Sequence, residues 1–233
     1  MLSNRIKSLP ASATLAMAAK ARELNNQGID IIGLSLGEPD FNTPEFIKEA
    51  AIQAVKDNYN SYSPVDGYAD LKAAICEKFK RDNGVEYQAS QIVVSTGAKQ
   101  SIANVCMVLL DPGDEVLLPA PYWVSYSAIA TLAEAKSIII PSSISTDFKI
   151  TPEQLEAAIT PKTKLVMFNS PNNPSGTIYT EAEYLALGAI LQKYPDIYIL
   201  SDEIYEHINY GTPHFSIAAI PELYDRTTVS YTH

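Results

Sequence analysis

The 233-residue sequence lacks the features of membrane, secreted and nucleic-acid-binding proteins. Its apolar runs, such as 137–141, are strand-length and far shorter than the roughly 20 residues that cross a bilayer. The N-terminus has no apolar core like that of a signal peptide. The net charge of −10 disfavours nucleic acid, which requires a basic surface. We therefore expect a cytoplasmic protein that binds neither nucleic acid nor membrane.

Cysteine and histidine are also scarce. Cys76 and Cys106 are isolated and fall in predicted helices, where buried free thiols are expected. His207, His214 and His233 show no metal-ligand spacing, so we expect surface or loop residues and no metal site. The sequence also contains no G-x-G-x-x-G motif and no Walker loop, which argues against a dinucleotide and against ATP.

Helical and strand patterns alternate along the chain, which predicts an α/β fold with a mostly parallel sheet. Thr43 is expected to cap a helix whose first residue is Pro44, and Thr151 with Gln154 resembles a capping box. The expected strands are 92–95, 115–118, 137–141, 164–169, 197–201 and 227–231. The expected helices are 12–27, 44–57, 69–83, 99–110, 123–133, 152–159 and 181–193.

Two polar motifs follow predicted strands. Asn169-Ser-Pro-Asn-Asn-Pro-Ser-Gly176 is a loop restricted by two prolines, in which Asn172 and Asn173 are either turn residues or positioned side chains. Asp202 ends an apolar strand and should be buried, so its carboxylate needs a partner. No basic residue lies within four positions of it, and the partner could be a protonated pyridine nitrogen of a cofactor.

Two further stretches are less specific. Ser95-Thr-Gly-Ala-Lys-Gln100 joins a strand to a helix, and the amides at the helix N-terminus could bind a phosphate beside Gly97. A glycine is nevertheless common at such turns. Trp123 follows another strand, where an indole could stack on a flat ring or simply fill the core beneath the loop.

Taken together, these motifs resemble the fold-type I pyridoxal-phosphate (PLP) aminotransferases, in the bacterial aspartate-aminotransferase-like branch of class I. The resemblance runs from Leu36-Ser-Leu-Gly-Glu-Pro-Asp-Phe41 to Tyr205. It implies a three-layer α/β fold, an N-terminal arm with part of the small domain at 1–40, and a PLP-binding large domain at 41–233. It also implies a cytoplasmic homodimer in amino acid metabolism and biosynthesis that exchanges an amino group between an L-amino acid and a 2-oxo acid.

The resemblance assigns four side chains to the PLP ring. Asp202 matches the carboxylate that keeps the pyridine nitrogen protonated, which makes the ring an electron sink. Trp123 matches the aromatic residue that stacks on the ring. Asn173 and Tyr205 match the two hydrogen-bond donors to the 3′ oxygen.

It assigns further residues to the phosphate and the substrate. Gly97, Ala98 and Lys99 match the phosphate-binding turn. Tyr62 matches the tyrosine that reaches the phosphate of the partner subunit's cofactor, and Gly37 matches the loop glycine that approaches the substrate carboxylate. Lys99 could also approach an acidic substrate side chain, which favours aspartate or glutamate and leaves aromatic amino acids and prephenate open.

The sequence departs from the family at its end. No lysine follows Tyr205, so no position matches the lysine that forms the Schiff base with PLP. The resemblance implies that the large-domain sheet is incomplete at the C-terminus, since the family has an antiparallel strand beside the one at 92–95. We expect the 233-residue chain alone to be inactive. An alternative is a non-catalytic relative that pairs with an aminotransferase subunit or a C-terminal fragment. A weaker one is an α/β enzyme for another phosphorylated ligand.

Overall fold

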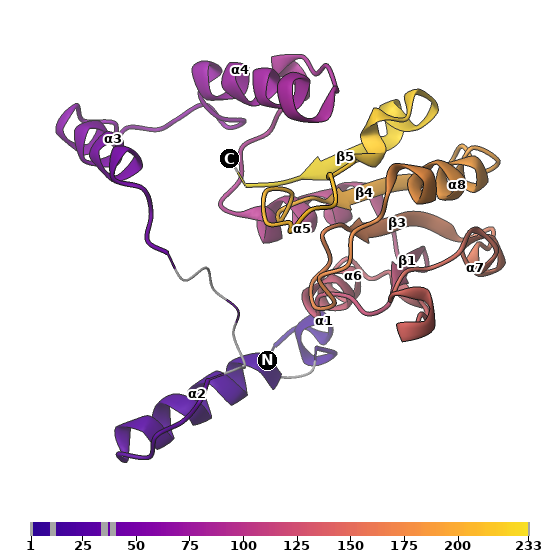
Figure 1. Ribbon diagram of the computed structural model, residues 1–233, viewed down its shortest axis with the longest axis horizontal. Coiled ribbons are helices and arrows are strands. Elements are labelled where there is room, and N and C mark those ends of the chain that lie inside the picture. The colour runs from indigo at the N-terminus through magenta and orange to yellow at the C-terminus, as the bar shows by residue number, and fades with distance from the viewer. Residues whose placement is uncertain (1, 10–12, 34–36, 38–40, 233) are drawn as a thin grey trace. The chain divides into compact units, whose positions relative to one another are not determined.

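The computed structural model describes residues 2–9, 13–33, 37 and 41–232. The chain divides into two compact units, Met1–Ile6 with Pro64–His233, and Lys7–Ser63 (Figure 1). The larger unit contains the sheet and the helices that cover it.

The smaller unit contains two helices, α2 (Ala13–Asn26) and α3 (Glu45–Lys56), and the short α1 (Asn4–Lys7) crosses its boundary. The predicted cap at Thr43 is wrong. Pro44 itself occupies the N-cap position of α3, and no side chain caps the helix there. The reason is its ψ angle of 143°, because this extended conformation keeps the proline outside the helix although its ring fixes φ.

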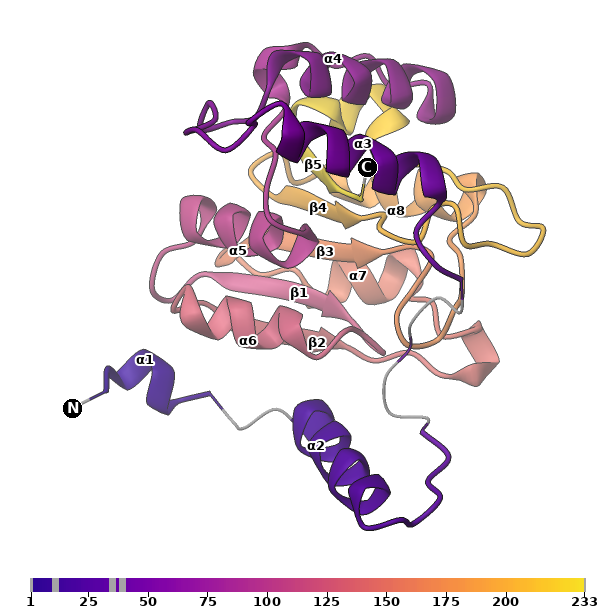
Figure 2. The ribbon, with the colours of Figure 1, turned by 90° about the vertical axis from the view of Figure 1, so that its left-hand side faces the viewer.

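A five-stranded parallel sheet forms the middle layer of the larger unit, with strand order β2-β1-β3-β4-β5 (Figure 2). Its strands are β1 (Glu115–Pro119), β2 (Lys136–Ile140), β3 (Thr163–Asn169), β4 (Tyr198–Asp202) and β5 (Thr227–Ser230). The parallel α/β fold expected from the sequence is confirmed. The order reverses between β1 and β3, because β2 lies on one side of β1 and the later strands lie on the other.

Helices cover both faces of the sheet, which gives the three layers. Helices α5 (Ala98–Leu109) and α6 (Ser125–Leu132) lie over one face, and α7 (Pro152–Ala158) and α8 (Glu181–Leu191) lie over the other (Figure 2). Because successive side chains of a strand point to opposite faces, β3 sends Leu165 to the first layer and Val166 to the second.

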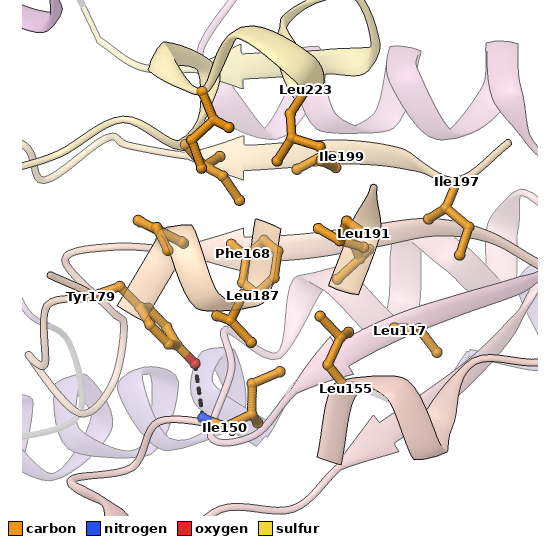
Figure 3. Packing of buried hydrophobic residues seen from close by; sticks show 14 of the residues in the cluster. Leu117, Ile150, Leu155, Phe168, Tyr179, Leu187, Leu191, Ile197, Ile199 and Leu223 are labelled. Atoms are coloured by element: carbon orange, nitrogen blue, oxygen red, sulfur yellow. Dashed lines mark hydrogen bonds between the residues drawn. The ribbon is translucent and has the colours of Figure 1, made fainter. Parts of the chain in front are cut away.

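The cluster beneath α7 and α8 joins side chains from helix and strand (Figure 3). Leu155 of α7 and Leu187 of α8 pack there with Leu117 of β1. The Ile150 amide donates to the hydroxyl oxygen of Tyr179 at 3.0 Å, so the polar end of this core tyrosine is satisfied. The predicted capping box at the start of α7 is confirmed.

Both cysteines are free thiols, as expected, but only Cys106 is buried, and the burial expected for Cys76 is wrong because its side chain is half-buried. Cys106 of α5 is completely buried on the opposite face, and burial raises the pKa of its thiol to about 12. Cys76 lies on α4 (Ala69–Lys78), which continues as a π-helical turn, Phe79–Asn83, and ends at Gly84. Short 3-10 segments complete the described elements: Ala89–Gln91, Ile144–Thr146, Ile217–Ala219 and Pro221–Arg226.

The strand predicted at 92–95 is wrong. Ile92 has extended backbone angles and is buried against Ile75 and Phe79, whereas Val93 is 65% exposed. The Val94 amide donates to the Asp66 carbonyl at 3.1 Å rather than to a strand of the sheet. An apolar run predicts extended backbone, but a strand also requires a ladder partner. The run therefore packs as an irregular segment.

Candidate functional site

The candidate site lies where the carboxyl ends of β1, β3 and β4 meet the N-terminus of α5. In an open parallel sheet, a crevice forms where the strand order reverses, here between β1 and β3. A small pocket lies at this position, and its lining includes Pro119, Tyr122, Tyr126, Met167, Asn169 and Asn172.

Asp202 is the buried acid of this site. It is the last residue of β4 and only 4% exposed, which confirms the predicted burial. The Tyr126 hydroxyl donates to one carboxylate oxygen at 2.5 Å, and the Ser230 hydroxyl donates to the other at 2.9 Å. Burial raises the pKa of the Asp202 carboxyl, and these two hydrogen bonds oppose that rise.

Both hydroxyl donors were invisible to the local sequence. Tyr126 is 76 positions from Asp202 and Ser230 is 28 positions away, so only the fold brings them together. Across the described part of the chain, no lysine, arginine or histidine forms an ion pair with Asp202. Within the described residues, the carboxylate is therefore hydrogen-bonded but has no ion-pair partner.

Asn173 and Tyr205 meet beside Asp202. Asn169 lies opposite Asp202 in the β3–β4 register, and its amide nitrogen donates to the Asp202 carbonyl at 2.8 Å. The Asn169 side-chain oxygen accepts the backbone N–H of Asn173 at 2.7 Å. The Asn173 amide nitrogen in turn donates to the Tyr205 hydroxyl oxygen at 3.3 Å. The strand register thus fixes an amide and a phenol side by side.

The two adjacent asparagines have different tasks. Asn172 donates to the Pro121 carbonyl at 3.2 Å and accepts the backbone N–H of Ser175 at 3.1 Å. It holds the loop together as a turn residue, whereas the Asn173 side chain contacts Tyr205.

Trp123 links the phosphate-type turn to the buried acid. Its ring meets Tyr126 edge-on, with centroids 5.5 Å apart, and the Lys99 ammonium lies 4.8 Å from the indole ring. Trp123 is half-buried and packs against the cluster beneath α5 and α6. Contacts therefore run without a break from Lys99 through Trp123 and Tyr126 to Asp202.

The N-terminus of α5 begins at the glycine turn. Gly97 is the N-cap with φ of +83°, and Ala98 is the buried first residue of the helix. A Cβ at Gly97 would meet no atom within 4 Å, so the backbone conformation rather than crowding accounts for the glycine. The free amides and the positive dipole end suit a phosphate.

Tyr62 and Gly37 belong to the smaller unit, Lys7–Ser63, and both are exposed within the described structure. The structure thus brings together Gly97, Ala98, Lys99, Trp123, Asn173, Asp202 and Tyr205 in the larger unit.

Glu203 is a second buried acid, which the sequence analysis did not single out. It is 1% exposed and accepts hydrogen bonds from the hydroxyls of Ser201, at 2.8 Å, and Ser216, at 2.7 Å. His214 Nε2 lies 2.9 Å from its other oxygen. His214 is in a loop, as expected, but its side chain is 8% exposed and is not at the surface.

Glu206 completes a cluster of ligand-type atoms with Glu203 and His214, all within 4.8 Å of one another. Such residues can bind a metal, but Glu206 already forms a buried ion pair with Lys78. His207 is an exposed residue, and His233 lies outside the described residues. No described helix has the length and apolar character that a membrane crossing requires.

The residue types around Asp202 fit PLP. A buried acid without a basic neighbour suits a protonated ring nitrogen, an amide and a phenol suit a ring oxygen, and a helix N-terminus suits a phosphate. The side chains that would serve these three groups belong to one continuous set of contacts.

Comparison with known proteins gives one consistent family. A family model described as aminotransferase class I and II matches residues 29–232. The aspartate/prephenate aminotransferase of Nitrosomonas europaea is 50% identical over 230 residues, which cover 98% of this chain and 58% of the relative. The aspartate aminotransferase of Bacillus subtilis is 48% identical over 229 residues, with 98% and 58% covered.

Solved structures agree with these relatives. A crystal structure of the aspartate aminotransferase from Rhizobium meliloti has a TM-score of 0.94 and 44% identity, covering 97% of this chain and 57% of that one. The Thermus thermophilus aspartate aminotransferase with maleate has a TM-score of 0.95 and 40% identity, covering 99% and 60%. The chain thus spans less than two thirds of the length of the proteins that it resembles.

Proposed function

Because this chain belongs to the class I and II aminotransferase family, we propose that its protein uses PLP to transfer an amino group between an L-amino acid and a 2-oxo acid. The observation that carries the proposal is the buried Asp202 carboxylate. It has two hydroxyl donors and, among the described residues, no ion-pair partner. A carboxylate held in this state is suited to retain a proton on a ring nitrogen.

The side chains around the ring have distinct roles in this proposal. Asp202 holds the proton on the ring nitrogen, and Tyr126 and Ser230 keep the carboxylate oriented. Asn173 and Tyr205 donate hydrogen bonds to the ring oxygen. Bound PLP supplies an electron sink for the substrate carbon from which a proton is removed.

The other site residues of the large domain bind and orient the cofactor. Trp123 stacks on the ring, and Gly97, Ala98 and Lys99 bind the phosphate at the N-terminus of α5. We take 41–233 as the PLP-binding large domain and 1–40 as the arm with part of the small domain.

We propose aspartate or glutamate as the amino acid, because relatives that are 48% and 50% identical carry the names aspartate and aspartate/prephenate aminotransferase. Lys99 would face an acidic substrate side chain. The protein would be a homodimer in the cytoplasm, with Tyr62 reaching the partner's cofactor and Gly37 approaching the substrate carboxylate. Since no lysine follows Tyr205, the 233-residue chain alone would bind PLP without turning over substrate.

The test compares the 233-residue chain with the protein at its natural length. Each is incubated with PLP, L-aspartate and a 2-oxo acid, and PLP binding and amino transfer are measured separately. We expect both to bind PLP and only a form that contains the covalent lysine to exceed the rate of PLP alone. Turnover by the chain alone would contradict its inactivity, and failure of both to bind PLP would contradict the cofactor.

An open sheet edge supports a second candidate, a non-catalytic subunit that pairs with another chain. Strand β5 ends the strand order, and Val93 in the irregular segment 92–95 is exposed. Such an edge accepts a strand from a partner subunit or a C-terminal fragment. Co-purification of a second chain would favour this function, and a stable soluble monomer would argue against it.

A further inference from the structure

A buried ion pair joins α4 to the loop that carries Tyr205. Lys78, the last residue of α4, and Glu206 are each 5% exposed, and their side chains form a salt bridge. They are 128 positions apart in the sequence. Since two buried charges lose their hydration, such a pair persists only if further hydrogen bonds satisfy it.

Asn83 supplies those hydrogen bonds to both charges. Its side-chain oxygen accepts from Lys78 Nζ at 2.8 Å, and its amide nitrogen donates to Glu206 at 3.1 Å. The π-helical turn Phe79–Asn83 makes this possible, because its wider turn brings residues five positions apart onto the same side. Short π-helical insertions occur frequently at functional sites.

Aromatic rings enclose the remaining side of the ammonium. Lys78 Nζ lies 4.5 Å from the ring centroid of Tyr231 and 4.7 Å from that of Phe79. The position of the ammonium is therefore fixed by a carboxylate, an amide oxygen and two ring faces. The ion pair is a rigid point to which the neighbouring loop can be attached.

The loop is attached through Glu206, the residue that follows Tyr205. Its backbone N–H donates to the Glu203 carbonyl at 3.0 Å, and its carbonyl accepts from the Asn209 side chain at 2.9 Å. The backbone on both sides of Tyr205 is thus held in one tight turn. The Tyr205 hydroxyl reaches Asn173 at the far end of its side chain.

We propose that Lys78 is a positioning residue, which acts through Glu206 to fix the Tyr205 phenol where it donates to the PLP ring oxygen. The inference rests on the proposed function and adds a residue that lies outside the candidate site. If Lys78 only neutralised the Glu206 charge, removing both charges would restore both the unfolding temperature and the affinity for PLP. If Lys78 positions Tyr205, removing both charges restores the unfolding temperature but not the affinity for PLP.

The experiment uses the protein at its natural length and four variants: Lys78→Met, the double variant Lys78→Met with Glu206→Leu, Tyr205→Phe, and Lys78→Met with Tyr205→Phe. Lys193→Met is the matched control, since Lys193 forms an exposed pair with Glu156. For each, we measure thermal unfolding without cofactor, the PLP dissociation constant, and the pH midpoint of the absorbance change of bound PLP.

We expect Tyr205→Phe to weaken PLP binding about tenfold and to move the pH midpoint upward, because the ring oxygen loses a donor that stabilises its negative charge. Lys78→Met and the charge-free double variant should show the same two changes, although the double variant regains the wild-type unfolding temperature. Adding Lys78→Met to Tyr205→Phe should change the dissociation constant less than about twofold. Lys193→Met should match the wild type.

Wild-type PLP binding and a wild-type pH midpoint in the double variant would overturn the inference. The inference would also be overturned if Lys78→Met changed the PLP dissociation constant by the same factor in the wild type and in Tyr205→Phe. Either result leaves the proposed function intact as long as Tyr205→Phe weakens binding. Failure of the wild-type protein to bind PLP would overturn both.

Discussion

The buried acids at the end of β4 differ in the partners that the chain provides for their carboxylates. Glu203 accepts from two hydroxyls and contacts His214, and Glu206 is neutralised by the Lys78 ammonium. Asp202, which directly precedes Glu203, has two hydroxyl donors, and burial raises the pKa of its carboxyl. The chain supplies hydrogen-bond partners or a counter-ion to the carboxylates of both glutamates, although His214 Nδ1 has no partner among the described residues. Asp202 has no ion-pair partner there, so its environment suits a cation.

The comparison separates acids that stabilise the fold from an acid kept for binding. Buried polar networks contribute to stability when every member is satisfied, and functional sites are the usual exceptions. If the distinction is correct, replacing the glutamates should weaken the fold. Replacing Asp202 should instead weaken ligand binding and leave the fold intact.

The largest effect is expected at Glu203. Replacement of Glu203 by alanine should lower the free energy of unfolding by about 3 kcal/mol, because the hydroxyls of Ser201 and Ser216 and the His214 ring lose their shared acceptor. Urea unfolding measures the change. Glu86→Ala is the control, since Glu86 is an exposed acid in a surface pair with Lys80. Equal free energies of unfolding for the two variants would contradict the claim that Glu203 stabilises the fold.

A smaller loss is expected from Tyr126→Phe. The phenol donates the shorter of the two hydroxyl hydrogen bonds to Asp202, so its removal leaves a buried carboxylate with one hydroxyl donor. We expect the free energy of unfolding to fall by about 2 kcal/mol. In the Asp202→Asn background the loss should be smaller, because the charge is gone. An unchanged loss in that background would show that the contribution of the hydroxyl does not depend on the Asp202 charge.

The smallest effect should have the opposite sign. Asp202→Asn should raise the free energy of unfolding without PLP by about 1 kcal/mol at neutral pH, because it removes a charge that burial disfavours. The folded-state pKa of Asp202 lies above its ordinary value of 3.8, so the wild-type carboxyl loses stability as pH rises through the folded pKa. The advantage of the asparagine variant should therefore vanish below that ordinary value and grow with pH.

Urea unfolding of the wild-type protein and of Asp202→Asn, measured from acid to neutral pH, gives the difference in the free energy of unfolding. The contributions of the other titrating groups cancel in this difference. An advantage that is largest in acid would contradict the assigned direction of the pKa shift.

Much of the fold follows from the sequence because apolar alternation and turn residues are local. The five strands observed were expected within a few residues, and Thr151 with Gln154 makes the predicted capping box. The prediction of a strand at 92–95 was wrong because strand pairing depends on a partner that is distant in the sequence. The Thr43 cap failed because the ψ angle of Pro44 is not set by its ring.

The candidate site was predictable only in part. Asp202, Asn173 and Trp123 could be singled out because each lies at the end of a strand or shortly after it, in a recognisable motif. Their partners could not, because Tyr126 and Ser230 come from other elements. Lys78 was also missed, since a lysine in a helix is normally exposed and nothing in the sequence indicates its burial beside Glu206.

The most direct measurement is the PLP dissociation constant of the wild-type protein and of Asp202→Asn at neutral pH, at the natural length of the protein. If Asp202 faces the ring nitrogen as proposed, loss of its charge should weaken binding about a hundredfold. Equal dissociation constants for the two proteins would contradict the account, because Asp202 would then be one more structural acid like Glu203.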